Sequence, residues 1–263
     1  MSQISYSSTA TILSDKVRFP AFLRTVPNDV YQTRAMVKLL SDNNWNWVGV
    51  ITTDGDYGRS ALDSFATEAA KNGICLAFKE VLPDSVTNPK VNSSIIQVVQ
   101  TIRSNGRAKV IVSFSKPSYM RQVFEQLQDG PAQDRVWIAS DSWSTSGNEL
   151  AHIDFAFIGK VVGFTFKSGN MSPFHRYLRQ LNASREKHSS NDTNIPFLRE
   201  FYHLVDSAKA EAILLNNTYS DAVFSIQMGI CAISQAVADL CSKIDCKTPG
   251  AVKPWQVKHN THC

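Results

Sequence analysis

Acidic side chains and a tyrosine follow the ends of segments that have the pattern of buried strands. Residues 49–65, GVITTDGDYGRSALDSF, change from an apolar run to an acidic turn that holds Tyr57, and then to a helical pattern. A second apolar run leads into the acidic loop ASDSW, residues 139–143. A carboxylate forms a charge-assisted hydrogen bond with an ammonium group, and an aromatic ring adds a cation–π attraction of about 0.5–2 kcal/mol. These residue types therefore suit a cationic group of a ligand.

Hydroxyl groups gather in a third loop, SYSST, at residues 5–9. Its hydroxyls and backbone amides suit a carboxylate, so the three loops together would bind a zwitterion such as a free α-amino acid. The same residues also have a purely structural explanation. Asp29 could cap the helix that it begins, and turn formation alone could explain Asp54 and Asp56. Packing against its neighbours alone could explain Tyr57. The residue types by themselves leave both the ligand-binding and the structural explanation open.

The elements that must position these loops alternate regularly between strand and helix. The pattern of short turns between them predicts an α/β fold with a parallel sheet and helices on both faces. Ligands of open parallel sheets bind at the carboxyl ends of the strands, where the three loops lie. The predicted strands are residues 47–53, 74–78, 109–115, 135–140 and 160–166, and the predicted helices are 30–41, 60–73, 93–106, 117–127 and a longer one from about Ser220.

Composition and missing motifs exclude several classes of function. The chain has 263 residues, 43% of them hydrophobic, which allows one large domain or two lobes. The formal net charge is +4, but the basic residues are scattered, so we expect no nucleic-acid partner. The sequence has no G-x-G-x-x-G, Walker A, G-x-S-x-G or H-E-x-x-H motif, and we expect no enzymatic activity.

Neither a membrane span nor a signal peptide is predicted. The apolar stretch 222–240 is interrupted by serine and glutamine residues, which favours a buried helix over a lipid-facing one. The first residues lack the basic and apolar regions of a signal peptide. Five glycosylation sequons nevertheless point to a secreted chain, and this conflict favours a fragment of a longer protein; the sequons begin at Asn92, Asn170, Asn182, Asn191 and Asn216.

Five cysteines give an odd count, which in a secreted chain indicates a free thiol or a partner elsewhere. A zinc cluster is one alternative, but its spacing is looser than structural zinc sites prefer, and a local disulfide or free thiols is the favoured interpretation. Cys231 lies in a predicted helix and is expected to be a small buried residue. The residues of the zinc alternative are Cys241, Cys246, His259, His262 and Cys263.

Several blocks of ten or more residues identify a family resemblance over nearly the whole chain. YSSTATILSDKVRFPAFLRTVPND, NWNWVGVITTDGDYGR, CLAFKEVLP and WIASDSWST resemble the extracellular amino-acid-binding module of class C G-protein-coupled receptors. ILSDKVRFPAFLRTVP, IGKVVGFTFKSGN and DLCSKIDCKTPGAVKPW are most similar to the member that responds to basic L-amino acids and is modulated by divalent cations.

The resemblance implies a ligand site of six residues: Ser7, Ser8, Thr9, Asp29, Tyr57 and Asp141. Thr9 and the backbone of the two serines would hold the α-carboxylate and α-ammonium of an L-amino acid. Asp29 and Tyr57 would face the ammonium from the second lobe, with Asp141 as a further anionic contact. The distal lysine of glutamate receptors falls near Gly250, which argues against an acidic ligand, although the nearby Lys253 leaves this open.

The fold implied by the resemblance is a two-lobed, periplasmic-binding-protein-like clamp of the Venus flytrap type. Residues 1–25 would end the first segment of lobe 1, residues 26–165 would form lobe 2, and residues 166–263 would return to lobe 1. Lobe 1 is expected to be incomplete, since its opening strands are missing. Closure of the lobes on a ligand would drive G-protein signalling in the full receptor without any covalent chemistry. No resident cofactor is implied, although Ca²⁺ or another divalent cation would modulate the response.

The resemblance also implies roles for cysteines and partners. Cys241 and Cys246 resemble a local disulfide of lobe 1, and Cys75 resembles a thiol that bridges to a cysteine-rich domain. The full receptor would be a homodimer in the plasma membrane, coupled to G proteins, with this region on the extracellular side. The chain would reach the membrane only through parts that it lacks.

Other interpretations remain open at the level of sequence. The chain could be a truncated receptor fragment that does not signal, or part of a related calcium-sensing or taste-type receptor. A soluble solute-binding protein with the same clamp, a zinc-stabilised interaction module and a product without a stable fold are further alternatives.

Overall fold

The computed structural model describes most of the chain: residues 3–187, 209, 212–213, 218–248, 250–253 and 256, with the side chains of 181–187 left out. The chain divides into two compact units. The first unit comprises Met1–Phe166 with Lys253–Lys258, and the second comprises Lys167–Val252 with His259–Cys263. How the predicted lobes divide the sequence remains a prediction.

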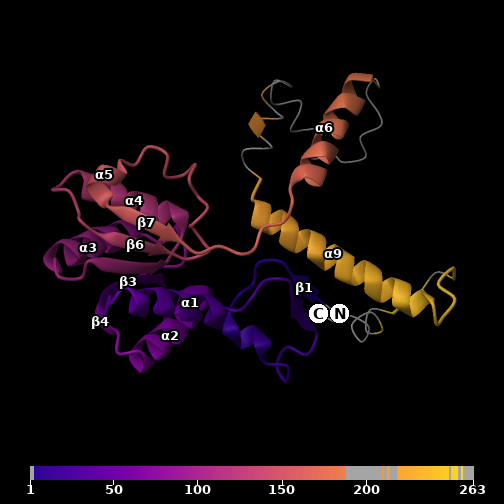
Figure 1. The fold of residues 1–263 in the computed structure, drawn as a ribbon, viewed down its shortest axis with the longest axis horizontal. Helices are drawn as coiled ribbons and strands as arrows, with labels where there is room; N and C mark the ends of the chain where they lie inside the picture. Colours follow the sequence, from indigo (N-terminus) through magenta and orange to yellow (C-terminus); the bar gives the residue numbers. More distant parts are fainter. Residues whose placement is uncertain are drawn as a thin grey trace. The chain divides into compact units, whose positions relative to one another are not determined.

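A five-stranded parallel sheet forms the centre of the first unit (Figure 1). Its order is β4-β3-β5-β6-β7, and each neighbouring pair is parallel. The prediction of an α/β fold with a parallel sheet flanked by helices is therefore confirmed. The strands are β3 (Trp47–Thr53), β4 (Cys75–Leu82), β5 (Val110–Phe114), β6 (Val136–Ala139) and β7 (Lys160–Gly163).

Helices cover both faces of this sheet, because the central strands are apolar on both sides. Val50 packs in the core that includes residues of α1 and α2, and its neighbour Ile51 packs in the core that includes residues of α3 and α4. Figure 1 shows α1 and α2 on one side of the sheet, opposite α3 and α4. These helices are α1 (Asp29–Asp42), α2 (Asp56–Lys71), α3 (Val91–Ser104) and α4 (Pro117–Gln128), and the short α5 (Phe155–Ile158) precedes β7.

A small parallel sheet of β1 (Gln3–Ser5) and β2 (Phe22–Arg24) precedes α1. The connection between its strands contains the short 3-10 helix η1 (Thr11–Ser14). The Arg24 guanidinium donates hydrogen bonds to the carbonyl oxygens of Ser8 and Ala10, at 3.1 and 3.2 Å. These contacts hold the hydroxyl-rich loop against the end of β2.

Two long helices are described in the second unit, α6 (Ser172–Lys187) and α9 (Ser220–Cys241). The expectation that α9 is a buried helix is wrong within the described residues. Nine of its 22 residues are exposed, among them Ile230, at 59%, and another nine are half-buried. Cys231 is also exposed rather than buried. The many apolar residues of α9 indicated a core position, but only four residues of this helix are buried: Ser225, Gly229, Ala236 and Leu240.

By length and composition alone, α9 could cross a membrane. It is the one such helix in the described part of the chain, with a mean hydropathy of 1.4 over its most apolar window. Core helices of soluble proteins pass the same test, so the indication is weak.

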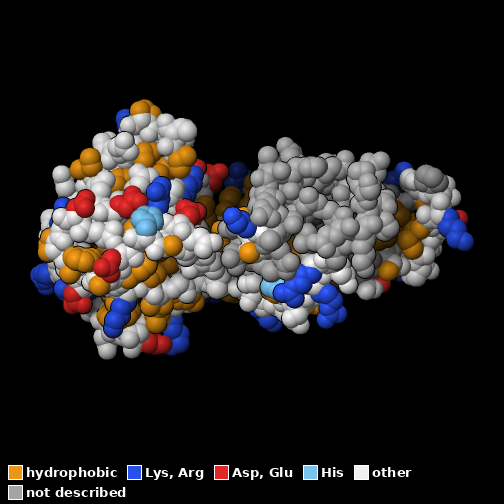
Figure 2. All heavy atoms as spheres, turned by 90° about the horizontal axis from the view of Figure 1, so that it is seen from above, with side chains coloured by type: hydrophobic (Ala, Val, Ile, Leu, Met, Phe, Trp, Pro, Cys, Tyr) orange, Lys and Arg blue, Asp and Glu red, His pale blue; other side chains and the backbone are white. Residues whose placement is uncertain are grey.

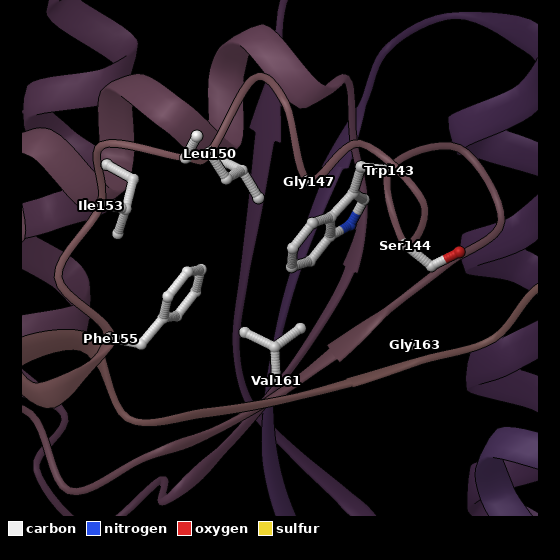
Figure 3. A pocket seen from close by; sticks show the side chains of 9 residues that line it. Trp143, Ser144, Gly147, Leu150, Ile153, Phe155, Val161 and Gly163 are labelled. Carbon is white, nitrogen blue, oxygen red and sulfur yellow. The ribbon is translucent and has the colours of Figure 1, made fainter. Parts of the chain in front are cut away.

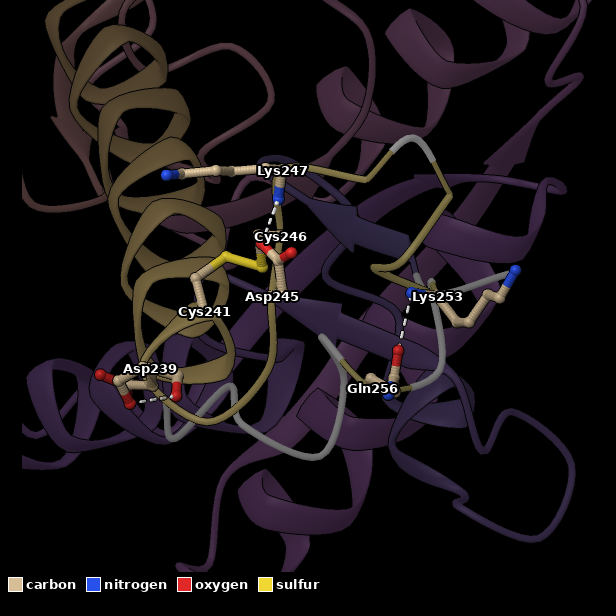
Figure 4. Close-up of a disulfide and its surroundings, with 8 residues drawn as sticks. Asp239, Cys241, Asp245, Cys246, Lys247, Lys253 and Gln256 are labelled. Carbon is tan, nitrogen blue, oxygen red and sulfur yellow. Dashed lines mark hydrogen bonds between the residues drawn. A yellow bond between two sulfur atoms is a disulfide. The ribbon is translucent and has the colours of Figure 1, made fainter.

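Cys241 and Cys246 form a disulfide at the end of α9, with their Cα atoms 5.4 Å apart (Figure 4). The Asp245 carboxylate accepts a hydrogen bond from the Lys247 backbone amide beside it. Cys75 and Cys231 are free thiols. Among the residues with described positions, no three His, Cys, Asp or Glu side chains form a group that could hold a metal, while His259, His262 and Cys263 lie outside them.

Acidic and basic side chains of the first unit are intermixed on the face drawn in Figure 2, with apolar patches between them. Two of the predicted glycosylation asparagines, Asn92 and Asn170, are exposed. The Asn182 side chain, Asn191 and Asn216 lie outside the described residues. Glycosylation at all five stays a prediction.

Candidate ligand-binding site

The Asp29 carboxylate lies buried at the start of α1 and does not cap the helix. Asn28 is the N-cap, and its side chain accepts a hydrogen bond from the Val30 amide at 3.2 Å. The Asp29 side chain is therefore not needed for capping, and the residue is only 1% exposed. Its backbone amide donates to the Thr9 carbonyl oxygen at 3.0 Å, which joins the hydroxyl-rich loop to α1.

Tyr57 is positioned by close packing of α2 against the carboxyl end of β3. A Cβ atom at Gly58 would lie 2.3 Å from the Thr53 carbonyl oxygen, so only glycine fits this contact. The Thr52 hydroxyl donates a hydrogen bond to the Gly58 carbonyl oxygen at 2.8 Å. The first turn of α2 is thus held at the end of the strand, together with the Tyr57 side chain.

The two other acids of this turn have structural positions. The Asp54 carboxylate accepts a hydrogen bond from the Asp84 amide at 2.6 Å and so connects two neighbouring loops. Asp56 is exposed in the first turn of α2, where a negative charge interacts favourably with the helix dipole. The structural explanation therefore holds for Asp54 and Asp56.

Asp141 connects three segments that are distant in the sequence. Its Oδ1 atom accepts a hydrogen bond from the Tyr57 hydroxyl at 2.9 Å and another from Gln32 Nε2 at 2.8 Å. Asp141 follows β6, Tyr57 follows β3 and Gln32 lies on α1. The structure therefore brings Asp141 and Tyr57 together, as the arrangement of loops at one sheet edge predicted.

Both oxygens of the Asp29 carboxylate are buried without a hydrogen-bond partner. No ion pair within 4 Å involves Asp29 among the described residues. Burial raises the pKa of Asp29, and the negative charge of Asp141 raises it further, while hydrogen bonding by the Thr9 and Ser60 hydroxyls and the positive charge of Arg24 lower it. A carboxyl group is thus enclosed at the start of α1 beside two hydroxyls, and no ion pair within 4 Å balances it among the described residues.

Burial also raises the pKa of Tyr57 well above its ordinary value. The negative charge of Asp141 acts in the same direction, since it opposes formation of a phenolate. Tyr57 therefore stays protonated at neutral pH and donates its hydrogen bond to Asp141.

Comparison with known proteins gives the family to which this site belongs. Residues 1–261 match the family described as receptor family ligand binding region. The chain is 50% identical over 260 residues to G-protein coupled receptor family C group 6 member A of Carassius auratus, and 36% identical over 284 residues to the Homo sapiens receptor of that name. It is 32% identical over 213 residues to the extracellular calcium-sensing receptor of Homo sapiens. The chain belongs to the receptor ligand-binding regions of class C G-protein-coupled receptors.

These matches cover most of the chain but a small part of each relative. They include 97%, 98% and 79% of this chain, in the order given above. The same matches span 29%, 31% and 19% of the three relatives. What the whole receptors do is therefore carried to this ligand-binding region only as a proposal.

Ser7 and Ser8 are engaged locally in this receptor ligand-binding region. Their backbone amides donate to the Ser5 hydroxyl oxygen, at 3.4 and 3.0 Å. Thr9, in contrast, is 4% exposed, and its carbonyl oxygen accepts a hydrogen bond from the Asp29 amide. The structure brings together four of the six predicted residues: Thr9, Asp29, Tyr57 and Asp141.

Sequence reasoning missed Gln32 and Ser60. Gln32 lies three residues after Asp29, on the same face of α1, and this spacing was the available signal. Ser60 lies three residues after Tyr57, and its hydroxyl oxygen accepts a hydrogen bond from the Thr11 amide at 3.1 Å. Both residues belong to the polar group around Asp29, which we define as Thr9, Asp29, Gln32, Tyr57, Ser60 and Asp141.

A separate cavity of about 390 Å³ lies beside β7 (Figure 3). Trp143, Leu150, Ile153, Phe155 and Val161 line it, and none of its lining residues carries a charge. A zwitterion would find no counter-charge there. The polar group around Asp29 is therefore the better candidate for an amino-acid site.

Proposed function

We propose that this receptor ligand-binding region binds free L-amino acids, with a preference for basic ones, through their α-ammonium group. The buried Asp29 carboxylate without a hydrogen-bond partner is the observation that carries the proposal. Burying a polar group without a partner costs about 1–3 kcal/mol, and more when it is charged. An ammonium beside Asp29 would supply both the donors and the opposite charge.

Asp141 and Tyr57 complete the cationic half of the proposed site. Asp141 adds a second negative charge, and its hydrogen bond from Tyr57 keeps it in place. The Tyr57 ring adds cation–π attraction. Thr9, with the backbone of Ser7 and Ser8, would bind the α-carboxylate, as the resemblance implies. The preference for basic side chains, and modulation by Ca²⁺ or another divalent cation, also rest on that resemblance.

In the whole receptor, this region would act as a sensor and not as an enzyme. An amino acid that contacts both lobes favours the closed state only through its higher affinity for that state. Closure would then drive G-protein signalling by a homodimer whose ligand-binding region lies on the extracellular side of the plasma membrane. No covalent step is needed.

Isothermal titration of the 263-residue chain tests this function. We expect L-arginine to bind, while D-arginine and Nα-acetyl-L-arginine, which lacks the ammonium charge, do not. Asp29→Asn should abolish binding. Asp63→Asn is the matched control, since Asp63 is exposed on α2 and should leave the affinity unchanged. Equal binding of the acetylated ligand would overturn the proposal.

A further inference from the structure

The Gln32 side chain has one hydrogen-bonded end and one end without a partner. Its Nε2 atom donates to Asp141 Oδ1 at 2.8 Å. Its Oε1 atom is buried and has no hydrogen-bond partner. An ionised carboxylate only accepts hydrogen bonds, so the nitrogen must face Asp141 and the oxygen must face away from it.

Three buried acceptor atoms lie on α1 without a hydrogen-bond partner, although the Thr9 and Ser60 hydroxyls lie near the first two: both carboxylate oxygens of Asp29 and Oε1 of Gln32. Asp29 and Gln32 lie about one turn apart on α1, and Asp141 is near enough to raise the pKa of Asp29. The Tyr57 hydroxyl proton is already used by Asp141. A bound group with several N–H donors of its own would satisfy these acceptors.

A primary ammonium has three N–H donors and a secondary ammonium has two. We propose that Gln32 Oε1 accepts a hydrogen bond from one N–H of the ligand's α-ammonium. The site would then prefer primary over N-methylated amino acids, because the methylated ammonium has one N–H donor fewer. This inference rests on the proposed function. It assigns to Gln32 two tasks, holding Asp141 with one end and binding ligand with the other.

A purely structural role of Gln32 makes a different prediction. If Gln32 only holds Asp141, removing its amide lowers the affinity for all amino acids equally. If Oε1 also binds the ammonium, its removal lowers the affinity for the primary amine and leaves the affinity for the N-methylated ligand nearly unchanged. Discrimination between the two ligands is thus the quantity to measure.

The experiment titrates the full 263-residue chain with L-arginine and with Nα-methyl-L-arginine. We expect the wild-type chain to prefer L-arginine about ten-fold, since one hydrogen bond to a charged group is at stake. In Gln32→Met, which keeps the length of the side chain, the preference should fall to within about two-fold. In Gln32→Glu, which keeps an acceptor oxygen, the preference should persist. Gln100→Met makes the same change at an exposed position of α3 and should alter neither affinity.

Each outcome decides the matter. A ten-fold preference that survives in Gln32→Met overturns the inference, and so does an equal loss for both ligands. A preference that is lost in Gln32→Glu as well would also contradict it. If the wild-type chain binds neither ligand, the proposed function itself fails and this inference fails with it.

Discussion

At the residue scale, the Asp29 carboxylate combines deep burial with the lack of an ion pair among the described residues. Such an arrangement lowers the stability of the free chain, because the folded state disfavours the charged form. We expect Asp29→Asn to raise the free energy of unfolding at pH 7 by about 1 kcal/mol. Urea denaturation measures this difference, and a less stable variant would contradict the account.

The raised pKa of Asp29 also gives this effect a defined pH dependence. A carboxyl whose pKa is raised on folding contributes stability that is fully present below its unfolded value, near 3.8. That contribution is lost as the pH rises through the folded pKa. The difference in the free energy of unfolding between Asp29→Asn and the wild-type chain should therefore increase as the pH rises through this range. L-arginine affinity should increase over the same range, because an ammonium favours the ionised carboxylate; a flat profile in both measurements would count against the buried charge.

Tyr57 allows a change of one hydroxyl. Tyr57→Phe removes the hydrogen bond to Asp141 and keeps the packing of the ring. We expect L-arginine affinity to fall about five- to ten-fold in titration, while the free energy of unfolding changes by less than about 1.5 kcal/mol. Tyr31→Phe is the control, since Tyr31 is 63% exposed on α1. Unchanged affinity in Tyr57→Phe would remove this tyrosine from the site.

At the element scale, the contact between α2 and β3 positions the tyrosine. Gly58→Ala would place a methyl group 2.3 Å from the Thr53 carbonyl oxygen. We expect a loss of about 1–3 kcal/mol in the free energy of unfolding, as for other overpacked sites. Gly106→Ala should stay within about 0.5 kcal/mol, because no atom lies within 4 Å of the added methyl group. Chemical denaturation of both variants checks the difference, and equal stabilities would show that this packing is not tight.

The sequence predicted the strands well because each is a short apolar run between turn residues. It placed the start of α2 too late, at residue 60, because the acidic turn itself forms the first helical turn from Asp56. The polar helix α6 was missed because its segment carries little apolar periodicity.

The site was predictable in part, for a geometric reason. Loops that follow parallel strands meet at one edge, so Tyr57 and Asp141 could be expected to approach each other. Gln32 could not be found in this way, because it contacts Asp141 across 109 residues of sequence. That contact depends on how α1 is rotated about its axis, which local sequence does not specify.

At the scale of the whole molecule, the chain is a ligand-binding region that spans less than a third of the receptors it resembles. Signalling would be a property of the complete receptor, while amino-acid binding can be tested on the chain itself. The exposed apolar residues of α9, such as Ile226 and Ile230, belong to the second unit and do not enter this test.

A thermal melt of the wild-type chain and of Asp29→Asn, each with and without L-arginine, tests the central claim most directly. A ligand that binds only the folded state raises the melting temperature by mass action. We predict that L-arginine raises the melting temperature of the wild-type chain and leaves that of Asp29→Asn unchanged. A cooperative wild-type melt without any shift, or an equal shift in both proteins, would contradict an ammonium site at Asp29.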